Sequence, residues 1–183
     1  MNDIRTQNME QLSNWLVAHF EKSFRAKQIS EWLWKKNAAS FDDMMNLPLA
    51  LREAMKQDFS LYKLNIIEKQ LSTDGSIKYA FQLADGNIIE TVLIPSRNRS
   101  TVCVSSQVGC GLACLFCATA NLGFTRNLYA YEMYEQVFIA NEESKLHFGH
   151  PITNLVWMGM GEPLLNYDNV MKAIEYVSTS AGL

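Results

Sequence analysis

Apolar residues recur at helical spacing through the first third of the chain. The pattern predicts three helices, which span residues 8–20, 24–36 and 49–59. Ser23 is typical of a residue that caps the start of a helix, and Pro48 suits a first helical turn. Ser40 with Asp43 three residues later resembles a capping box before a short helical turn. The sequence therefore predicts a compact helical domain over residues 1–60.

The period of the apolar pattern then changes to two. Three runs rich in Ile, Leu, Tyr and Val predict strands at residues 62–71, 77–83 and 87–94. Asp-Gly pairs at 74–75 and 85–86 separate these runs and are strong hairpin signals. We therefore expect a three-stranded meander, followed by a polar connector from Pro95 to Ser100.

The last part of the chain alternates strands with helices. Strands are predicted at 101–106 and 152–158, the second buried on both faces, and helices at 129–147 and 167–182. Strand–helix alternation is the opening of a parallel α/β fold, and two such units leave a sheet edge uncovered. We expect the N-terminal part of a longer α/β protein, with domains at 1–60, 61–98 and 99–183.

Composition narrows the class of protein. The chain has 183 residues, of which 48% are hydrophobic and 19% charged, and it contains no apolar run of the length of about 20 residues that a membrane span needs. The N-terminus does not resemble a secretory signal, so we expect a cytoplasmic protein without a membrane partner. A net charge of −3 does not itself indicate a nucleic-acid binder.

Basic residues nevertheless gather between positions 22 and 36. They are Lys22, Arg25, Lys27, Lys35 and Lys36, opposed there only by Glu31. Such a face is as typical of a solvated helix as of an RNA contact. The tryptophans of this region, Trp15, Trp32 and Trp34, are most simply core and edge residues, with nucleobase stacking as the alternative.

All four cysteines lie between Thr101 and Arg126. Cys110, Cys114 and Cys117 have the spacing Cys-x3-Cys-x2-Cys. Three thiolates in one loop can hold three irons of a [4Fe-4S] cluster and leave the fourth iron open. A structural zinc site or two disulfides are the alternatives. Against zinc, no histidine lies at the spacing that zinc sites usually have. Against disulfides, thiols stay reduced in the cytoplasm, where we expect this protein. The fourth cysteine, Cys103, lies in the predicted strand before this loop.

A second loop of interest follows the strand at 152–158. It reads Gly159-Met160-Gly161-Glu162-Pro163, and in α/β folds ligands bind beyond the carboxyl ends of the strands. Its glycines expose backbone groups, and Glu162 can accept a hydrogen bond from a cationic amine. By itself the loop could be an ordinary turn; next to the cysteine loop, it predicts a site for an amino-acid-like ligand.

These motifs resemble known ones. The cysteine spacing, with Phe116 before the last cysteine, resembles the radical S-adenosylmethionine signature, and GMGEP resembles that superfamily's motif for the methionine amino group. More narrowly, VCVSSQVGC, GFTRNL, VWMGMGEPLLN and FRAKQISEWLWKK resemble the RlmN/Cfr family of RNA adenine methyltransferases, in its carbon-2 branch. The resemblance runs from about residue 10 to the end of the chain.

The resemblance implies a fold, cofactors and roles. The fold would be a helical RNA-binding domain, a small β extension and the start of a partial (βα)6 barrel. Cys110, Cys114 and Cys117 would bind the cluster, while Gly161, Glu162 and Phe116 would bind S-adenosylmethionine. Glu90 matches a proton acceptor. Cys103 matches a cysteine that releases a methyl–RNA adduct by forming a disulfide with a second, methyl-carrying cysteine, which the family has in its C-terminal half.

The implied reaction is a ping-pong methyl transfer through a radical to adenine carbon 2 in 23S rRNA and tRNA. An external flavodoxin-like electron donor and a monomeric state are expected from the family. Because the methyl-carrying cysteine is absent from these 183 residues, we do not expect them to complete catalysis alone. The alternatives are a non-catalytic RNA-binding fragment and a structural zinc-binding domain.

Overall fold

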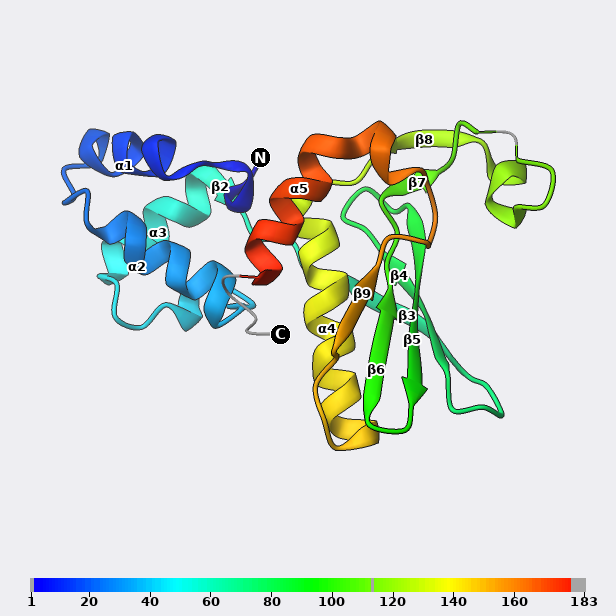
Figure 1. The fold of residues 1–183 in the computed structure, drawn as a ribbon. Helices are drawn as coiled ribbons and strands as arrows, with labels where there is room; N and C mark the ends of the chain where they lie inside the picture. Colours follow the sequence, from blue (N-terminus) through cyan, green and yellow to red (C-terminus); the bar gives the residue numbers. More distant parts are fainter. Residues whose placement is uncertain (1, 113, 179–183) are drawn as a thin grey trace. The chain divides into compact units, whose positions relative to one another are not determined.

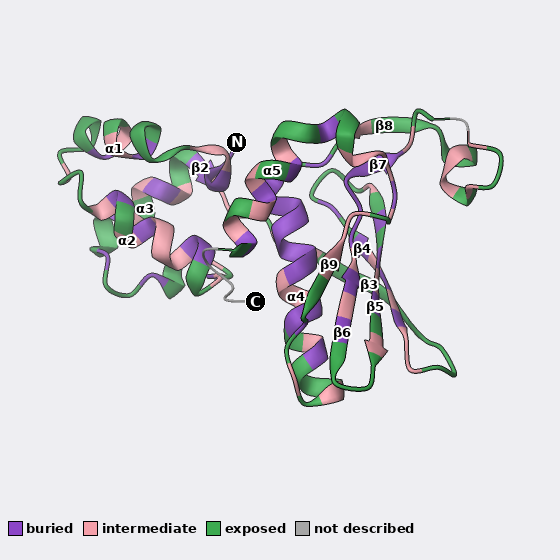
Figure 2. Cartoon of the chain, in the orientation of Figure 1, coloured by how far each residue is buried: buried purple, intermediate pink, exposed green. Residues whose placement is uncertain are grey.

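The computed structural model describes residues 2–112 and 114–178. The chain forms two compact units that divide between Lys63 and Leu64. Each unit has a buried interior of its own, shown in purple in Figure 2. The α-helices and most strands of both units are labelled in Figure 1.

The first unit is mainly helical. Its elements are β1 (Asn2–Asp3), η1 (Ile4–Thr6), α1 (Met9–Ala18), α2 (Arg25–Ser30), η2 (Glu31–Lys35), η3 (Phe41–Asp43), α3 (Leu49–Asp58) and β2 (Phe59–Ser60). The apolar face of each helix packs inward, and the buried side chains include Leu12, Leu16, Ile29, Leu33, Leu51 and Met55. The three predicted helices are confirmed, and the second continues from α2 into the π-helical turn η2.

One of the two predicted polar caps is present in the structure. Asp43 accepts hydrogen bonds from the backbone N–H groups of Ala39 (2.8 Å) and Ser40 (2.9 Å), which confirms the capping box. The expected cap at Ser23 is wrong. α2 begins after Phe24, which makes no side-chain cap, because residues 23–24 lie in a turn and Ser23 contributes only its carbonyl, to the Ala26 N–H.

A five-stranded sheet organises the second unit, in the order β3-β4-β5-β6-β9. Its strands are β3 (Asn65–Leu71), β4 (Ile77–Gln82), β5 (Ile88–Ser96), β6 (Arg99–Cys103) and β9 (Asn154–Val156). The predicted meander β3-β4-β5 is antiparallel and confirmed. β6 and β9 run parallel, joined through helix α4 (Ala130–Phe148), so the α/β class is confirmed.

The expected polar connector after Pro95 is wrong, because the sheet continues through it. Pro95 pairs with Ser100 and Ser96 with Arg99, so β5 and β6 form a hairpin that turns at Arg97, whose φ is 44°. Proline is tolerated there because β4 ends opposite Leu93, which leaves the other side of Pro95 without a ladder partner. The meander and the parallel strands are therefore one sheet.

Helix α4 covers one face of this sheet, and its inward side is buried (Figure 2). The Tyr79 hydroxyl donates to Glu143 of α4 (2.9 Å), and the Thr91 hydroxyl donates to Gln136 of α4 (2.8 Å). α5 (Tyr167–Tyr176) packs beside α4. The predicted helix at 167–182 is confirmed as far as it is described, while its expected end at Gly182 lies outside the described residues.

The remaining elements of the second unit flank the loops of interest. They are β7 (Gln107–Gly109), η4 (Ala118–Leu122), β8 (Phe124–Asn127) and η5 (Pro163–Asn166). The expected burial of β9 on both faces is wrong: Asn154 is exposed and Val156 half-buried, since β9 pairs only with β6 among the described strands. No helix in the described ranges has the length and apolar character needed to cross a bilayer.

Candidate functional site: the cysteine loop and the glycine-rich loop

A short ladder closes the base of the cysteine loop. β7 and β8 pair antiparallel, with Val108 opposite Arg126 and Gly109 opposite Phe124. The Cys110 N–H then donates to the Gly123 carbonyl (2.9 Å). Gly109 has φ +72°, and a β-carbon there would lie 1.7 Å from the Gly123 oxygen. Only glycine fits at this neck, which lets the two strands close tightly at the base of the loop.

The three loop cysteines sit in different surroundings. All are free thiols of intermediate exposure. The Thr119 backbone N–H, the Thr119 hydroxyl and the Ala120 backbone N–H donate hydrogen bonds to Cys117 and lower the pKa of its thiol. The Leu112 N–H lies 3.4 Å from the sulfur of Cys110. Donors of this kind favour thiolates, which are the ligands that iron–sulfur clusters use.

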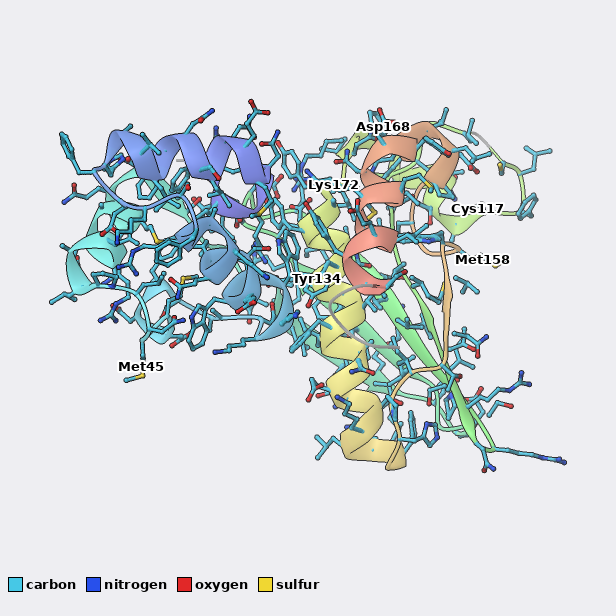
Figure 3. All side chains as sticks on the ribbon, turned by 60° about the vertical axis from the view of Figure 1, so that its left-hand side comes forward. Met45, Cys117, Tyr134, Met158, Asp168 and Lys172 are labelled. Atoms are coloured by element: carbon cyan, nitrogen blue, oxygen red, sulfur yellow. The ribbon has the colours of Figure 1, made fainter. Side chains whose placement is uncertain are left out.

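The donor set fits a cluster chemically, and its assignment stays a prediction. Within residues 2–112 and 114–178, no three Cys, His, Asp or Glu side chains are gathered as a metal ion requires. Phe116, predicted to touch the cofactor, is 93% exposed beside the fully exposed Leu115. The loop, with Cys117 labelled, is seen in Figure 3.

The glycine-rich loop is tied directly to the segment before the cysteine loop. The Met160 N–H donates to the Ser105 hydroxyl (2.9 Å), and the Ser106 N–H donates to the Met160 carbonyl (2.8 Å). The next residue after Ser106 also takes part: the side-chain carbonyl of Gln107 accepts a hydrogen bond from the Glu162 N–H (2.9 Å). Residues 105–107 lead straight into Cys110, so these bonds join the two loops.

Both glycines of this loop are needed for that close approach. A β-carbon on Gly159 would lie 2.7 Å from the Val104 carbonyl carbon and oxygen. One on Gly161, where φ is +95°, would lie 2.5 Å from the β-carbon of Gln107. The glycines therefore bring the backbone of one loop against the other, beyond the cofactor contact predicted for Gly161.

Glu162 is held at the start of a helical turn. Its carboxylate accepts a hydrogen bond from the Leu164 N–H (3.1 Å) and caps η5, while the side chain stays partly accessible. The buried Asn166 follows, and its amide donates to the carbonyls of Ser106 and Leu128 (2.8 Å each). A carboxylate fixed in this way can still accept a hydrogen bond from an ammonium group.

Cys103 and Glu90 lie on the sheet face opposite α4. Cys103 pairs with Val92 and Val156, and Glu90 is two residues from Val92, so their side chains share the uncovered face. Burial raises the pKa of the Cys103 thiol, and a hydrogen bond from the Met158 backbone N–H opposes this. Met158 is labelled in Figure 3.

Glu90 is exposed and paired on that face. Lys78 donates to its carboxylate (2.9 Å). The two line a shallow pocket of about 90 Å³ together with Glu68, Gln70 and Ala80. Glu90 thus faces solvent on the same open surface as Cys103, while Cys110, Cys114 and Cys117 lie in the loop that follows β7.

An ion-pair network at the loop base was missed by the sequence reasoning. Arg126 makes a two-point contact with the buried Glu132 (2.8 Å each) and a further contact with Asp85 (2.6 Å). Burial raises the pKa of Asp85, but hydrogen bonds from Arg126 and Asn87 outweigh it and lower the pKa to about 2. The sequence did contain a signal for this network. The arginine of GFTRNL lies six residues before Glu132, which is in the first turn of α4. The network joins β8, the start of α4 and the β4–β5 turn.

Comparisons with known proteins show the family of the chain. Residues 3–61 match the family described as the ribosomal RNA large subunit methyltransferase N-terminal domain. A crystal structure of a radical SAM methyltransferase from Sphaerobacter thermophilus is 38% identical, with a TM-score of 0.82, over 97% of this chain and 52% of that one.

Curated relatives extend the likeness. A "probable dual-specificity RNA methyltransferase RlmN" of Cytophaga hutchinsonii is 49% identical over 98% of this chain and 49% of its own length. The "dual-specificity RNA methyltransferase RlmN" of Campylobacter fetus is 42% identical over the whole chain and 54% of its own length.

The fold is that of a radical SAM methyltransferase. Within that class, the chain belongs to the RlmN family. It spans about half the length of the curated relatives it matches.

Proposed function

We propose that these residues supply the cofactor-binding and part of the RNA-binding machinery of a radical SAM methyltransferase that methylates carbon 2 of adenine in 23S rRNA and tRNA. The observation that carries the proposal is the joining of the two loops. Ser105, Ser106 and Gln107 bind the Gly159–Glu162 backbone and lead directly into the cysteine loop. A cluster and the amino acid part of S-adenosylmethionine would then be held by one continuous support.

The proposed roles follow from the surroundings of each residue. Cys110, Cys114 and Cys117 hold the [4Fe-4S] cluster, and Gly161, Glu162 and Phe116 hold S-adenosylmethionine. When bound, these groups supply a radical that can react at an electron-poor ring carbon. The carboxylate of Glu162 is capped on one oxygen by the Leu164 N–H, which directs its remaining hydrogen-bonding capacity to the ligand's ammonium.

Cys103 and Glu90 are assigned to the later steps on the open sheet face. Because burial raises the pKa of Cys103, its thiol stays protonated at neutral pH and needs a base before it attacks. Glu90, the proposed proton acceptor, is held in place by Lys78. The four cysteines of this chain are free thiols. The disulfide partner of Cys103 would be a cysteine in the C-terminal half of the family's proteins, which this chain does not span.

The partners follow from the same proposal. The substrates are 23S rRNA and tRNA, which places the protein in the cytoplasm, where an external reductant such as a flavodoxin-like protein supplies the electron. We propose a monomer, because the residues proposed to hold the cluster and S-adenosylmethionine all belong to one chain.

A binding measurement tests the proposal. The chain, reconstituted anaerobically with iron and sulfide, is titrated with S-adenosylmethionine in equilibrium dialysis. Glu162→Gln should weaken binding by roughly tenfold or more, because a hydrogen bond to a charged group is worth about 1.5–3 kcal/mol. Glu142→Gln, an exposed carboxylate on α4, should leave binding unchanged. Absence of binding to the reconstituted chain, or equal loss in both variants, would contradict the proposal.

A second candidate function is RNA binding without catalysis. The match of residues 3–61 to a separate N-terminal domain family favours it, together with the exposed lysines of that unit. RNA affinity that persists in Cys114→Ala, and falls in Lys35→Glu with Lys36→Glu, would support it. A chain with no RNA affinity at low salt would rule it out.

A further inference from the structure

The turn between α1 and α2 places a phenylalanine where helices usually have glycine. α1 ends with the Glu21 N–H donating to the Leu16 carbonyl (2.8 Å) and the Phe20 N–H donating to that of Val17 (3.1 Å). This is the Schellman pattern, whose left-handed position favours glycine. Phe20 occupies it with φ 59°. A side chain there costs about 1–2 kcal/mol relative to ordinary helical backbone.

Among the described residues, no packing of the Phe20 side chain offsets that cost. The Phe20 side chain is fully exposed, with a relative exposure of 101%. Phe24, four residues on and at the start of α2, is 57% exposed. Backbone strain around a side chain without packing indicates a role outside the fold.

The tryptophans of the same unit are occupied by structural contacts. The indole N–H of Trp15 donates to Asp58 (2.7 Å), and that of Trp32 donates to Asn46. The ammonium of Lys36 lies 3.6 Å from the ring centre of Trp32 and covers it. Trp34 is buried. Phe20 and Phe24 are therefore the aromatic side chains with exposed rings beside the basic segment.

The charge around these rings is positive. Lys22 and Lys27 are exposed, and neither has an acidic partner among the described residues. Arg25 pairs with Glu21 (2.7 Å), and its guanidinium lies 5.7 Å from the ring centre of Phe24. Exposed rings alternating with unpaired cations are the composition of surfaces that bind single-stranded nucleic acid.

We propose that Phe20 and Phe24 form a stacking surface for unpaired RNA bases, with Lys22 and Lys27 contacting the adjacent phosphates. This inference rests on the proposed RNA-binding function and assigns the contact residues. A lipid surface or a protein partner fits less well, because Glu21, Lys22 and Ser23 separate the two rings along the chain.

Phe20→Gly gives the decisive test. A structural role of Phe20 predicts a lower melting temperature, whereas a binding role predicts weaker RNA affinity without loss of stability. Glycine relieves the left-handed strain and removes no packed side chain, so the melting temperature of the chain should stay equal or rise. Affinity for an unstructured A-rich RNA 12-mer, measured by fluorescence anisotropy at low salt, should fall at least about fivefold, as expected for one lost stacking contact. Phe24→Ala should also weaken RNA binding, and Phe20→Trp should retain it.

Two controls separate stacking from charge. Heparin carries negative charge without bases, so its affinity should be unchanged in Phe20→Gly and reduced in Lys22→Glu with Lys27→Glu. Met45→Ala removes another exposed apolar side chain of this unit and should leave RNA affinity unchanged.

Retention of RNA affinity in Phe20→Gly and Phe24→Ala would overturn the stacking surface while leaving the proposed function intact. Equal loss of heparin and RNA affinity in Phe20→Gly would overturn it too. Failure of the proposed function would instead appear in S-adenosylmethionine binding, which these substitutions do not touch.

Discussion

Gly161 and Gly86 use the left-handed backbone for different purposes. Both have positive φ, +95° and +83°. A β-carbon on Gly86 would meet nothing within 4 Å, whereas one on Gly161 would lie 2.5 Å from Gln107. Gly86 serves only a turn, while Gly161 also allows the glycine-rich loop to rest on the segment that leads to the cysteines.

This difference predicts unequal costs of alanine substitution. Gly86→Ala should lower the free energy of unfolding by about 1–2 kcal/mol, from backbone strain alone. Gly161→Ala should cost about 1–3 kcal/mol more, because the Gln107 side chain and backbone must also move. Urea unfolding of the two variants measures this; equal losses would show that the two loops do not depend on close contact.

At the scale of single residues, the sequence indicated the reactive groups better than their supports. The cysteine spacing and GMGEP marked Cys110, Cys114, Cys117 and Glu162, whose roles stay predictions. The supporting roles of Ser105, Gln107 and Asn166 were not predicted, although these residues lie within VCVSSQVGC and VWMGMGEPLLN, because an isolated polar residue has no periodicity or spacing that indicates what it contacts. Their importance is visible only once the fold brings residues about 55 positions apart into hydrogen-bonding distance.

At the scale of elements, the sequence predicted the helices and strands that have a regular apolar period. It missed the short strand pairings of β7–β8 and of the β5–β6 hairpin. The meander and α4 have regular apolar periods and were confirmed. The β7–β8 ladder was missed because its strands are short, β7 ends in glycine, and the two lie about 15 residues apart. The β5–β6 hairpin was taken for a connector because Pro95 and five polar residues obscure its pairing.

The Arg126 network should hold the base of the cysteine loop. Arg126→Gln leaves the 3%-exposed Glu132 carboxylate without its cation, so we expect a loss of about 3–5 kcal/mol in the free energy of unfolding. Lys145→Gln removes an exposed pair on the same α4 helix and should cost less than about 1 kcal/mol. Similar urea midpoints for the two variants would contradict this role of Arg126.

At the scale of the whole molecule, the chain combines two units with different chemistry. The first unit presents exposed lysines and aromatic rings, and the second presents a loop of thiols beside a glycine-rich loop. One face of its sheet is covered by α4, and the other displays Cys103 and Glu90. In the account proposed here, cofactors bind within the second unit, and RNA contacts begin on the first.

The most direct test is metal content after anaerobic reconstitution with iron and sulfide, measured together with visible absorbance. The wild-type chain should bind about four irons and four sulfides and turn brown. Cys110→Ser, Cys114→Ser and Cys117→Ser should each abolish the chromophore, and Cys103→Ser should retain it. Stoichiometric zinc without iron, or loss of the cluster in Cys103→Ser alone, would contradict the account.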